Sequence, residues 1–131
     1  MKKVILLSIL FFNYNALLGQ EISGSWNWQH KDGIHQTEIT LIKIGDNSFE
    51  GYYCSSFYDG KKIDCTFSNT EVCINIEKIS ENTYQGNFIS PSFNGNGEVK
   101  FVFQPSNNSL KVEILNSENE FYLPTNVFFI R

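Results

Sequence analysis

Short runs of alternating apolar and polar residues cover most of this chain, and each run ends at a cluster of Gly, Asn, Asp or Ser. Alternation with a period of two is typical of a β-strand with one buried face, and those clusters are the residues that turns require. Good helix formers are scarce, since the only alanine is Ala16, whereas Ile, Val, Phe, Tyr and Thr are plentiful. The sequence therefore predicts an all-β protein.

The pattern predicts eight or nine strands joined by short turns. Their expected ranges are 23–29, 35–44, 48–57, 61–67, 71–79, 83–90, 98–104, 110–115 and 126–131. A meander of this length protects its edges most easily by closing, so we expect an antiparallel up-and-down barrel, with a two-sheet sandwich as the alternative. A barrel of about eight strands holds packed side chains or one small ligand.

The N-terminus has the layout of a secretory signal peptide. Two lysines precede an apolar run over residues 4–12, which is too short to span a bilayer comfortably as a helix. Gly19 offers a cleavage point, and no cysteine follows it closely, so we expect no lipid anchor. The predicted organisation is a cleaved signal peptide over 1–19 and one barrel domain over 20–131, secreted or periplasmic. The alternative, a buried N-terminal helix, lacks the amphipathic rhythm of such a helix.

The charge balance argues against two classes of partner. The chain has 10 basic and 14 acidic side chains and a net charge of −4, and removal of the two leader lysines takes this to −6. Nucleic acids and anionic membrane surfaces attract basic residues, so we expect neither as a partner.

The first hairpin sets the faces of its two strands. A two-residue turn at Asp32-Gly33 fixes the register across it. The resulting pairs are His30 with His35, Trp28 with Thr37, and Trp26 with Ile39. The face that carries these residues is the more apolar one, so we expect both tryptophans to point inward and both histidines to lie at the rim.

Gly24-Ser25-Trp26 resembles the Gly-x-Trp opening of the calycin group, which comprises lipocalins, fatty-acid-binding proteins and avidins. The resemblance implies a barrel whose tryptophan closes one end, with a basic residue from the last strand packed across it. Arg131 matches that residue, and a guanidinium over an indole is a favourable cation–π contact. With Leu123-Pro124 before the last strand, the order of elements is also similar to small secreted bacterial barrels of uncharacterised function.

The run 49–55 is similar to the second hairpin of avidins. The resemblance implies that Tyr53 and Ser55 occupy positions that bind the ureido oxygen of biotin, with Thr37 near an expected serine. The match is incomplete, because Trp28 replaces an expected asparagine and the later tryptophans that cage biotin are absent. A small apolar molecule is therefore the broader expectation. The candidate ligand site at the barrel mouth is Trp28, His30, His35, Thr37, Tyr53 and Ser55.

His30 and His35 form a cross-strand pair in this register, with Cβ atoms roughly 5 Å apart. Two imidazoles at that spacing can share Zn²⁺ or Cu²⁺, and Asp32 in the turn adds a carboxylate. Without a further ligand in clear reach, the simpler interpretation is two polar residues near water. We therefore expect no metal and no cofactor.

Three cysteines leave one unpaired thiol if two form a bridge in an oxidising compartment. A two-residue turn at Asp59-Gly60 places Cys54 opposite Cys65 and leaves Tyr53 outside. A three-residue loop puts Tyr53 inside and sends the two cysteines to opposite faces. Cys54–Cys65 is the first choice of bridge, although both registers remain open. Cys73 is expected to be a buried free thiol, because no base is placed to activate it.

Motifs of enzyme active sites are absent from the sequence, which has no Gly-x-Ser-x-Gly elbow, phosphate loop or His-Glu-x-x-His run. We therefore expect a protein that is not an enzyme. The first candidate function is to carry a small apolar ligand in or at the mouth of the barrel. The second is to bind a protein, as an inhibitor or immunity-type protein does, through exposed aromatics such as Tyr58 and Tyr122. An open barrel favours the first, and a filled barrel with an aromatic surface patch favours the second.

Overall fold

The computed structural model describes residues 21–66 and 71–131, and in these ranges the chain forms only β-strands. The strands are β1 (Gly24–Gln29), β2 (Gln36–Lys43), β3 (Ser48–Phe57), β4 (Lys62–Cys65), β5 (Ile74–Ser80), β6 (Thr83–Ile89), β7 (Asn96–Gln104), β8 (Ser109–Glu118) and β9 (Val127–Ile130). The predicted signal peptide over 1–19 and the end of the predicted strand 61–67 lie outside the described residues. The described ranges contain no helix with the length and apolar character needed to cross a membrane.

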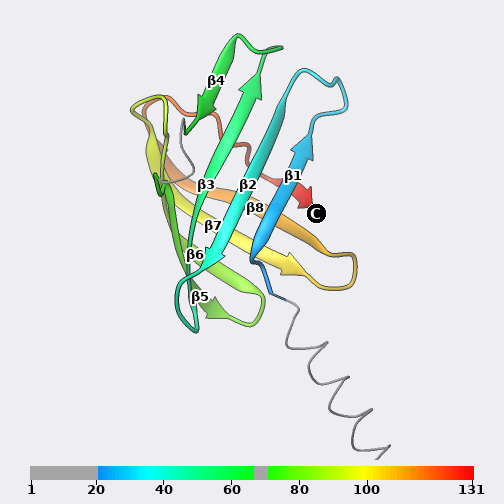
Figure 1. The fold of residues 1–131 in the computed structure, drawn as a ribbon, viewed down its shortest axis with the longest axis vertical. Coiled ribbons are helices and arrows are strands. Elements are labelled where there is room, and N and C mark those ends of the chain that lie inside the picture. The colour runs from blue at the N-terminus through cyan, green and yellow to red at the C-terminus, as the bar shows by residue number, and fades with distance from the viewer. Residues whose placement is uncertain (1–20, 67–70) are drawn as a thin grey trace, which may run out of the picture.

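Eight of the strands form a closed antiparallel barrel, and β4 is an extra strand beside it (Figure 1). The order is β2-β1-β9-β8-β7-β6-β5-β3, and the pairing of β2 with β3 closes it. The predicted fold class is therefore confirmed, and the sandwich alternative is wrong. The chain departs from a strict meander in one place, because β3 pairs with β5 through its first half and with β4 through its second half.

The closure between β1 and β9 is the narrowest pairing in the wall. Asn27 and Ile130 are the single residue pair that joins these two strands. By contrast, β1 and β2 are paired from Gly24 to Gln29. We call the β1–β9 contact the seam of the barrel.

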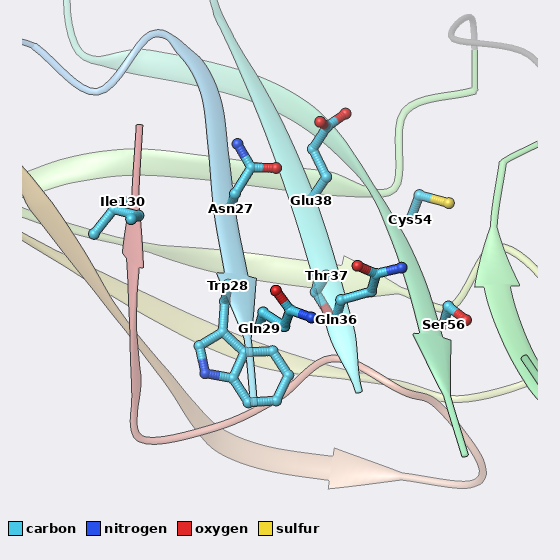
Figure 2. Close-up of a pocket in the computed structure, with 9 residues that line it drawn as sticks. All are labelled: Asn27, Trp28, Gln29, Gln36, Thr37, Glu38, Cys54, Ser56 and Ile130. Carbon is cyan, nitrogen blue, oxygen red and sulfur yellow. The ribbon is translucent and has the colours of Figure 1, made fainter. Parts of the chain in front are cut away.

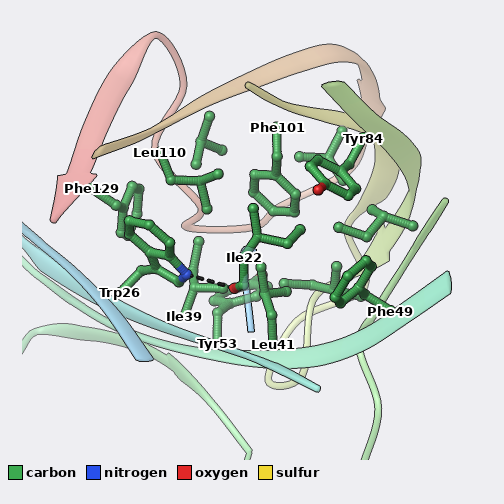
Figure 3. Packing of buried hydrophobic residues seen from close by; sticks show 14 of the residues in the cluster. Ile22, Trp26, Ile39, Leu41, Phe49, Tyr53, Tyr84, Phe101, Leu110 and Phe129 are labelled. Carbon is green, nitrogen blue, oxygen red and sulfur yellow. Dashed lines mark hydrogen bonds between the residues drawn. The ribbon is translucent and has the colours of Figure 1, made fainter. Parts of the chain in front are cut away.

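The interior of the barrel is filled by inward-facing side chains from all eight strands of the wall. Figure 3 shows part of this cluster, in which aromatic rings and aliphatic side chains pack together. Its largest fully buried members are Trp26, Tyr53, Phe88, Phe101 and Phe129. Apolar burial of this kind is the dominant favourable term in folding, so the packed interior is what holds the wall together.

The β3–β4 hairpin shows which of the two open registers forms. Asp59 and Gly60 have φ of 55° and 86°, as a two-residue hairpin turn requires, and Cys54 lies directly opposite Cys65. The expectation that this register leaves Tyr53 outside is wrong, since Tyr53 is only 1% exposed. The reason is that the two cysteines occupy the outer face. The neighbouring positions, which include Asp64, therefore point inward.

Candidate functional site

Trp26 and Arg131 meet at one end of the barrel. Trp26 is fully buried, and its indole N–H donates to the carbonyl oxygen of Ile22 over 2.8 Å (Figure 3). The guanidinium carbon of Arg131 lies 4.3 Å from the centroid of the Trp26 ring, within the range of a cation–π contact. The same guanidinium donates to the carbonyl oxygens of Glu21 and Ser23. These contacts cap this end of the barrel with the chain's own groups.

Thr37, Ser55 and Tyr53 converge in the interior toward the other end. The hydroxyl oxygens of Thr37 and Ser55 lie 2.7 Å apart across the β2–β3 pair. The Tyr53 hydroxyl donates to Asp64 over 2.6 Å. The structure thus brings together three residues of the predicted mouth site, but each hydroxyl is bonded to a group of the same chain.

Asp64 is a buried carboxylate that accepts four hydrogen bonds. One of its oxygens accepts from the Tyr53 hydroxyl and, over 2.9 Å, from the backbone N–H of Tyr122. The other accepts from the Ser90 hydroxyl over 2.7 Å and from the backbone N–H of Ser92 over 3.1 Å. These bonds tie β4 to β3, to the β6–β7 turn and to the segment that precedes β9.

The buried polar groups beneath the mouth form what we call the polar layer, which consists of Thr37, Tyr53, Ser55, Asp64 and Ser90. Every buried side-chain nitrogen or oxygen in residues 21–66 and 71–131 has a hydrogen-bond partner. A cavity shaped for a ligand instead aims a few polar groups at the bound molecule to fix its orientation. In this layer the hydroxyls of Thr37 and Ser55 bind each other, and Asp64 accepts from the hydroxyls of Tyr53 and Ser90.

Seven rings surround this end of the barrel in a continuous set of contacts, which we call the aromatic rim. Its members are Trp28, His30, His35, Phe57, Tyr58, Phe93 and Tyr122. Neighbouring ring centroids lie between 4.8 and 6.5 Å apart. The rings come from the β1–β2 hairpin, the β3–β4 hairpin, the β6–β7 turn and the segment before β9. Four separate parts of the chain therefore build one aromatic surface.

Polar contacts hold the rim in place. The backbone N–H of Tyr58 donates to Nδ1 of His35 over 3.1 Å, which joins the two hairpins. The Lys62 ammonium lies 5.6 Å from the Phe93 ring and 3.3 Å from the Glu120 carboxylate. Because both hairpins and the segment before β9 are linked, the rim is a preformed surface.

The two histidines of the rim face one carboxylate. Oδ2 of Asp32 lies 3.0 Å from Nδ1 of His30 and 3.9 Å from Nε2 of His35. The backbone N–H of Ile34 and the neighbouring His30 hold the pKa of Asp32 below its usual value. In the part of the chain that the structure describes, no group of three or more His, Cys, Asp or Glu side chains is arranged to hold a metal ion.

The cysteines lie on opposite sides of the wall. Cys54 and Cys65 form a disulfide on the outer face, with their Cα atoms 4.0 Å apart. Cys73 is a free, buried thiol, and its burial raises its pKa to about 11. Because the thiolate is the nucleophilic form, the raised pKa lowers the reactivity of Cys73 at neutral pH.

A hollow of about 550 Å³ lies over the outer face of β1, β2 and β3, beside the seam (Figure 2). We call it the outer hollow. Its lining residues are Asn27, Trp28, Gln29, Gln36, Thr37, Glu38, Cys54, Ser56 and Ile130. Most of them alternate with the core residues along their strands and so point away from the interior. The exceptions are Thr37, which also belongs to the polar layer, and Trp28, which also belongs to the aromatic rim, so the outer hollow borders both.

Alkaline pH is expected to destabilise the protein from about pH 9 upward. Burial and the hydrogen bond to Asp64 raise the pKa of Tyr53, and burial raises the pKa of Cys73 to about 11 from an ordinary 9.0. Both groups hold their protons more tightly in the folded state, so the unfolded chain releases them first, and its free energy falls relative to that of the folded state as the pH rises. The contribution of these two groups to the free energy of unfolding is therefore fully present below their unfolded pKa values. It is lost progressively as the pH rises above those values.

The measurement is the melting temperature by circular dichroism between pH 7 and 11. We expect a continuous fall above about pH 9, and a smaller fall in Tyr53→Phe, which has no phenol to ionise. A melting temperature that stays constant to pH 11 in the unmodified protein contradicts the assignment of Tyr53 as a buried donor to Asp64.

Asp64, Phe57 and Phe93 belong to this end of the barrel but were not singled out by the sequence pattern. A signal for Asp64 existed, because the two-residue register places it opposite Ser55, and a position opposite an inward residue is also inward. The two phenylalanines gave no such signal, since their contacts come from distant parts of the chain. The site is defined by geometry alone, since comparison of the chain with protein-family models, curated proteins and solved structures gives no match.

Proposed function

We propose that this protein is an exported, non-catalytic binding domain that holds a protein partner against its aromatic rim. One observation carries the proposal. The rings of the rim lie in mutual contact at the end of the barrel, and Tyr58 among them is 52% exposed. Tyr and Trp dominate the energetic centres of protein interfaces. Rings that already pack against one another lose little conformational freedom when a partner covers them.

The polar layer favours a protein partner over a small molecule carried inside the barrel. Thr37, Ser55 and Asp64 are buried and hydrogen-bonded within the chain. A ligand that entered the barrel would have to break these bonds, and a buried polar group left unpaired is costly. A protein surface covers the rim from outside and leaves the interior unchanged.

The charge of the chain supports a basic partner. The net charge is −4, and −6 without the predicted leader. Long-range attraction between surfaces of opposite charge speeds association and suppresses wrong partners. An inhibitor or immunity-type protein that covers a basic partner is the class of function that we infer.

We also infer a relation to the calycin group and an exported location. Three features support the relation, namely the Gly-x-Trp opening at Gly24, the buried Trp26, and Arg131 across its ring. The predicted leader supports export, as does the Cys54–Cys65 disulfide, because disulfides persist in oxidising compartments.

The test is site-specific photo-crosslinking in cells that produce the protein. A photoreactive phenylalanine analogue replaces Tyr58 in the rim or, as a control, Asn75, which is exposed on β5. We expect one protein to crosslink reproducibly from position 58 and not from position 75. Tyr122→Ala is expected to reduce its yield about tenfold, as the loss of a central interface aromatic does.

Two results contradict the proposal. The first is equal crosslinking from positions 58 and 75, which indicates random contact. The second is native mass spectrometry of the protein from those cells that shows a small-molecule adduct and no protein partner. That adduct would instead support a carrier of a small apolar ligand.

A further inference from the structure

The outer hollow presents polar side chains in two rows across the sheet. Ile130, Asn27, Glu38 and Cys54 are successive neighbours on β9, β1, β2 and β3. Gln29, Gln36 and Ser56 form the second row, two residues further along each strand. Neighbours within a row are about 5 Å apart, and the rows are about 7 Å apart. The hollow therefore offers a regular grid of hydrogen-bonding groups.

The side chains of this grid are uncharged, with the exception of Glu38. The lining holds the carboxamides of Asn27, Gln29 and Gln36, the hydroxyls of Thr37 and Ser56, and the Glu38 carboxylate, but no Lys or Arg. A carboxamide both donates and accepts hydrogen bonds, and a carboxylate accepts several. Hydroxyl groups of a ligand also both donate and accept, so they match this set. An anionic ligand does not, because no cation is present to offset its charge.

The polar groups of the outer hollow are uncommitted, in contrast to those of the polar layer. Asn27, Gln36 and Glu38 are exposed, and none of the three has a side-chain hydrogen bond or ion pair to another residue in 21–66 or 71–131. On the opposite face of the same strands, the Thr37–Ser55 hydrogen bond joins β2 to β3. The grid therefore lies on strands that are bonded together, and its polar side chains are available to form hydrogen bonds with a ligand.

Apolar surface completes the lining on one side. Ile130 is 62% exposed, and Trp28 contributes the only aromatic residue of the lining (Figure 2). A sugar ring has an apolar face of C–H groups and an edge of hydroxyl groups. The amides of the outer hollow can bind the hydroxyl groups, and the apolar surface of Ile130 and Trp28 can cover the C–H face.

We propose that the outer hollow binds a neutral oligosaccharide. Asn27, Gln36 and Glu38 hold its hydroxyl groups, and Ile130 covers part of its apolar face. A volume of about 550 Å³ lies in the range of small-ligand sites. This role is additional to protein binding at the aromatic rim, because Asn27, Gln36 and Glu38 lie on the outer face and only Trp28 borders both sites.

The test is an NMR titration of the ¹⁵N-labelled protein with a panel of neutral oligosaccharides, namely maltotriose, cellotriose, xylotriose and N-acetylated chitotriose. We expect saturable shifts of the backbone amides around Asn27 and Gln36 with at least one sugar. Asn27→Ala/Gln36→Ala is expected to bind about tenfold more weakly, because two hydrogen bonds are lost. The matched control, Asn75→Ala/Gln85→Ala, removes two amides from β5 and β6 and is expected to bind like the unmodified protein.

Three results overturn the proposal. They are the absence of a saturable shift with every sugar, unchanged binding by Asn27→Ala/Gln36→Ala, and binding of spermidine alone that is lost in Glu38→Gln, which would make this a cation site. An oligogalacturonate is expected not to bind, and tight binding of this polyanion also contradicts the charge argument. Sugar binding that persists in Tyr122→Ala separates this proposal from the role of the aromatic rim.

Discussion

Asp64→Ala is expected to lower the free energy of unfolding by about 4 kcal/mol, because it leaves four donors without their acceptor. The hydroxyls of Tyr53 and Ser90 and the backbone N–H groups of Ser92 and Tyr122 all donate to this carboxylate. A buried donor that loses its partner costs about 1–3 kcal/mol, and water that enters the gap recovers part of the total. The melting temperature should fall by roughly 15 °C.

The measurement is urea unfolding followed by circular dichroism, together with a thermal melt. Asp46→Ala is the matched control, because Asp46 is exposed in the β2–β3 turn, and its effect should stay within about 0.5 kcal/mol. Asp64→Asn should lie between the two, since the amide keeps one accepting oxygen. If Asp64→Ala lost less than about 1 kcal/mol, the four bonds would not hold β4 against the barrel.

Trp26→Ala is the second substitution for which we expect a large loss of stability. It should lower the free energy of unfolding by about 4 kcal/mol. The side chain is fully buried, packs edge-on against Phe103 and lies under the Arg131 guanidinium. Removal of the indole leaves a cavity at the end of the barrel and frees the carbonyl of Ile22. It also removes the ring that Arg131 covers, so the contacts that cap this end are weakened together.

Trp28→Ala serves as the comparison, since Trp28 is only partly buried and should cost about half as much. Both variants are measured by circular dichroism, because either substitution alters tryptophan fluorescence. Equal losses from the two substitutions would contradict the view that Trp26 plugs one end of the barrel while Trp28 belongs to a solvent-facing rim.

Local turn chemistry made the hairpins predictable from the sequence. The Asp32-Gly33 signal placed Trp28 opposite Thr37 and Trp26 opposite Ile39, and the structure has both pairs. The alternation along these strands then separated the core face from the outer face. The closed antiparallel barrel followed from the number of such strands and the need to protect their edges.

Long-range pairing was not predictable from the same signals. Two strands share one edge of β3, and no local pattern indicates that β5 takes the first half and β4 the second. β8 runs to Glu118, past the predicted end at residue 115, because its last residues pair with the start of β7. Such extensions depend on a partner that is distant in the sequence.

The candidate site was predictable only in part for the same reason. The sequence placed His30 and His35 at the rim and Trp28, pointing inward, in the mouth site, because one hairpin carries all three. Phe93 and Tyr122 join them through turns that lie far along the chain. The alternation also marked the outer-face amides as ordinary solvent-facing positions, so their gathering around a hollow became visible only in three dimensions.

The seam has a consequence for the order in which this protein can fold. It joins Asn27 to Ile130, and Arg131 reaches back across 108 positions of sequence to the carbonyl of Ser23. Contacts between such distant residues carry a large loop-closure entropy and form slowly. The ring of strands therefore stays open until the ribosome has delivered the last strand. The export proposed above requires an unfolded chain, and late closure is compatible with it because no complete ring of strands holds the chain before the last strand is made.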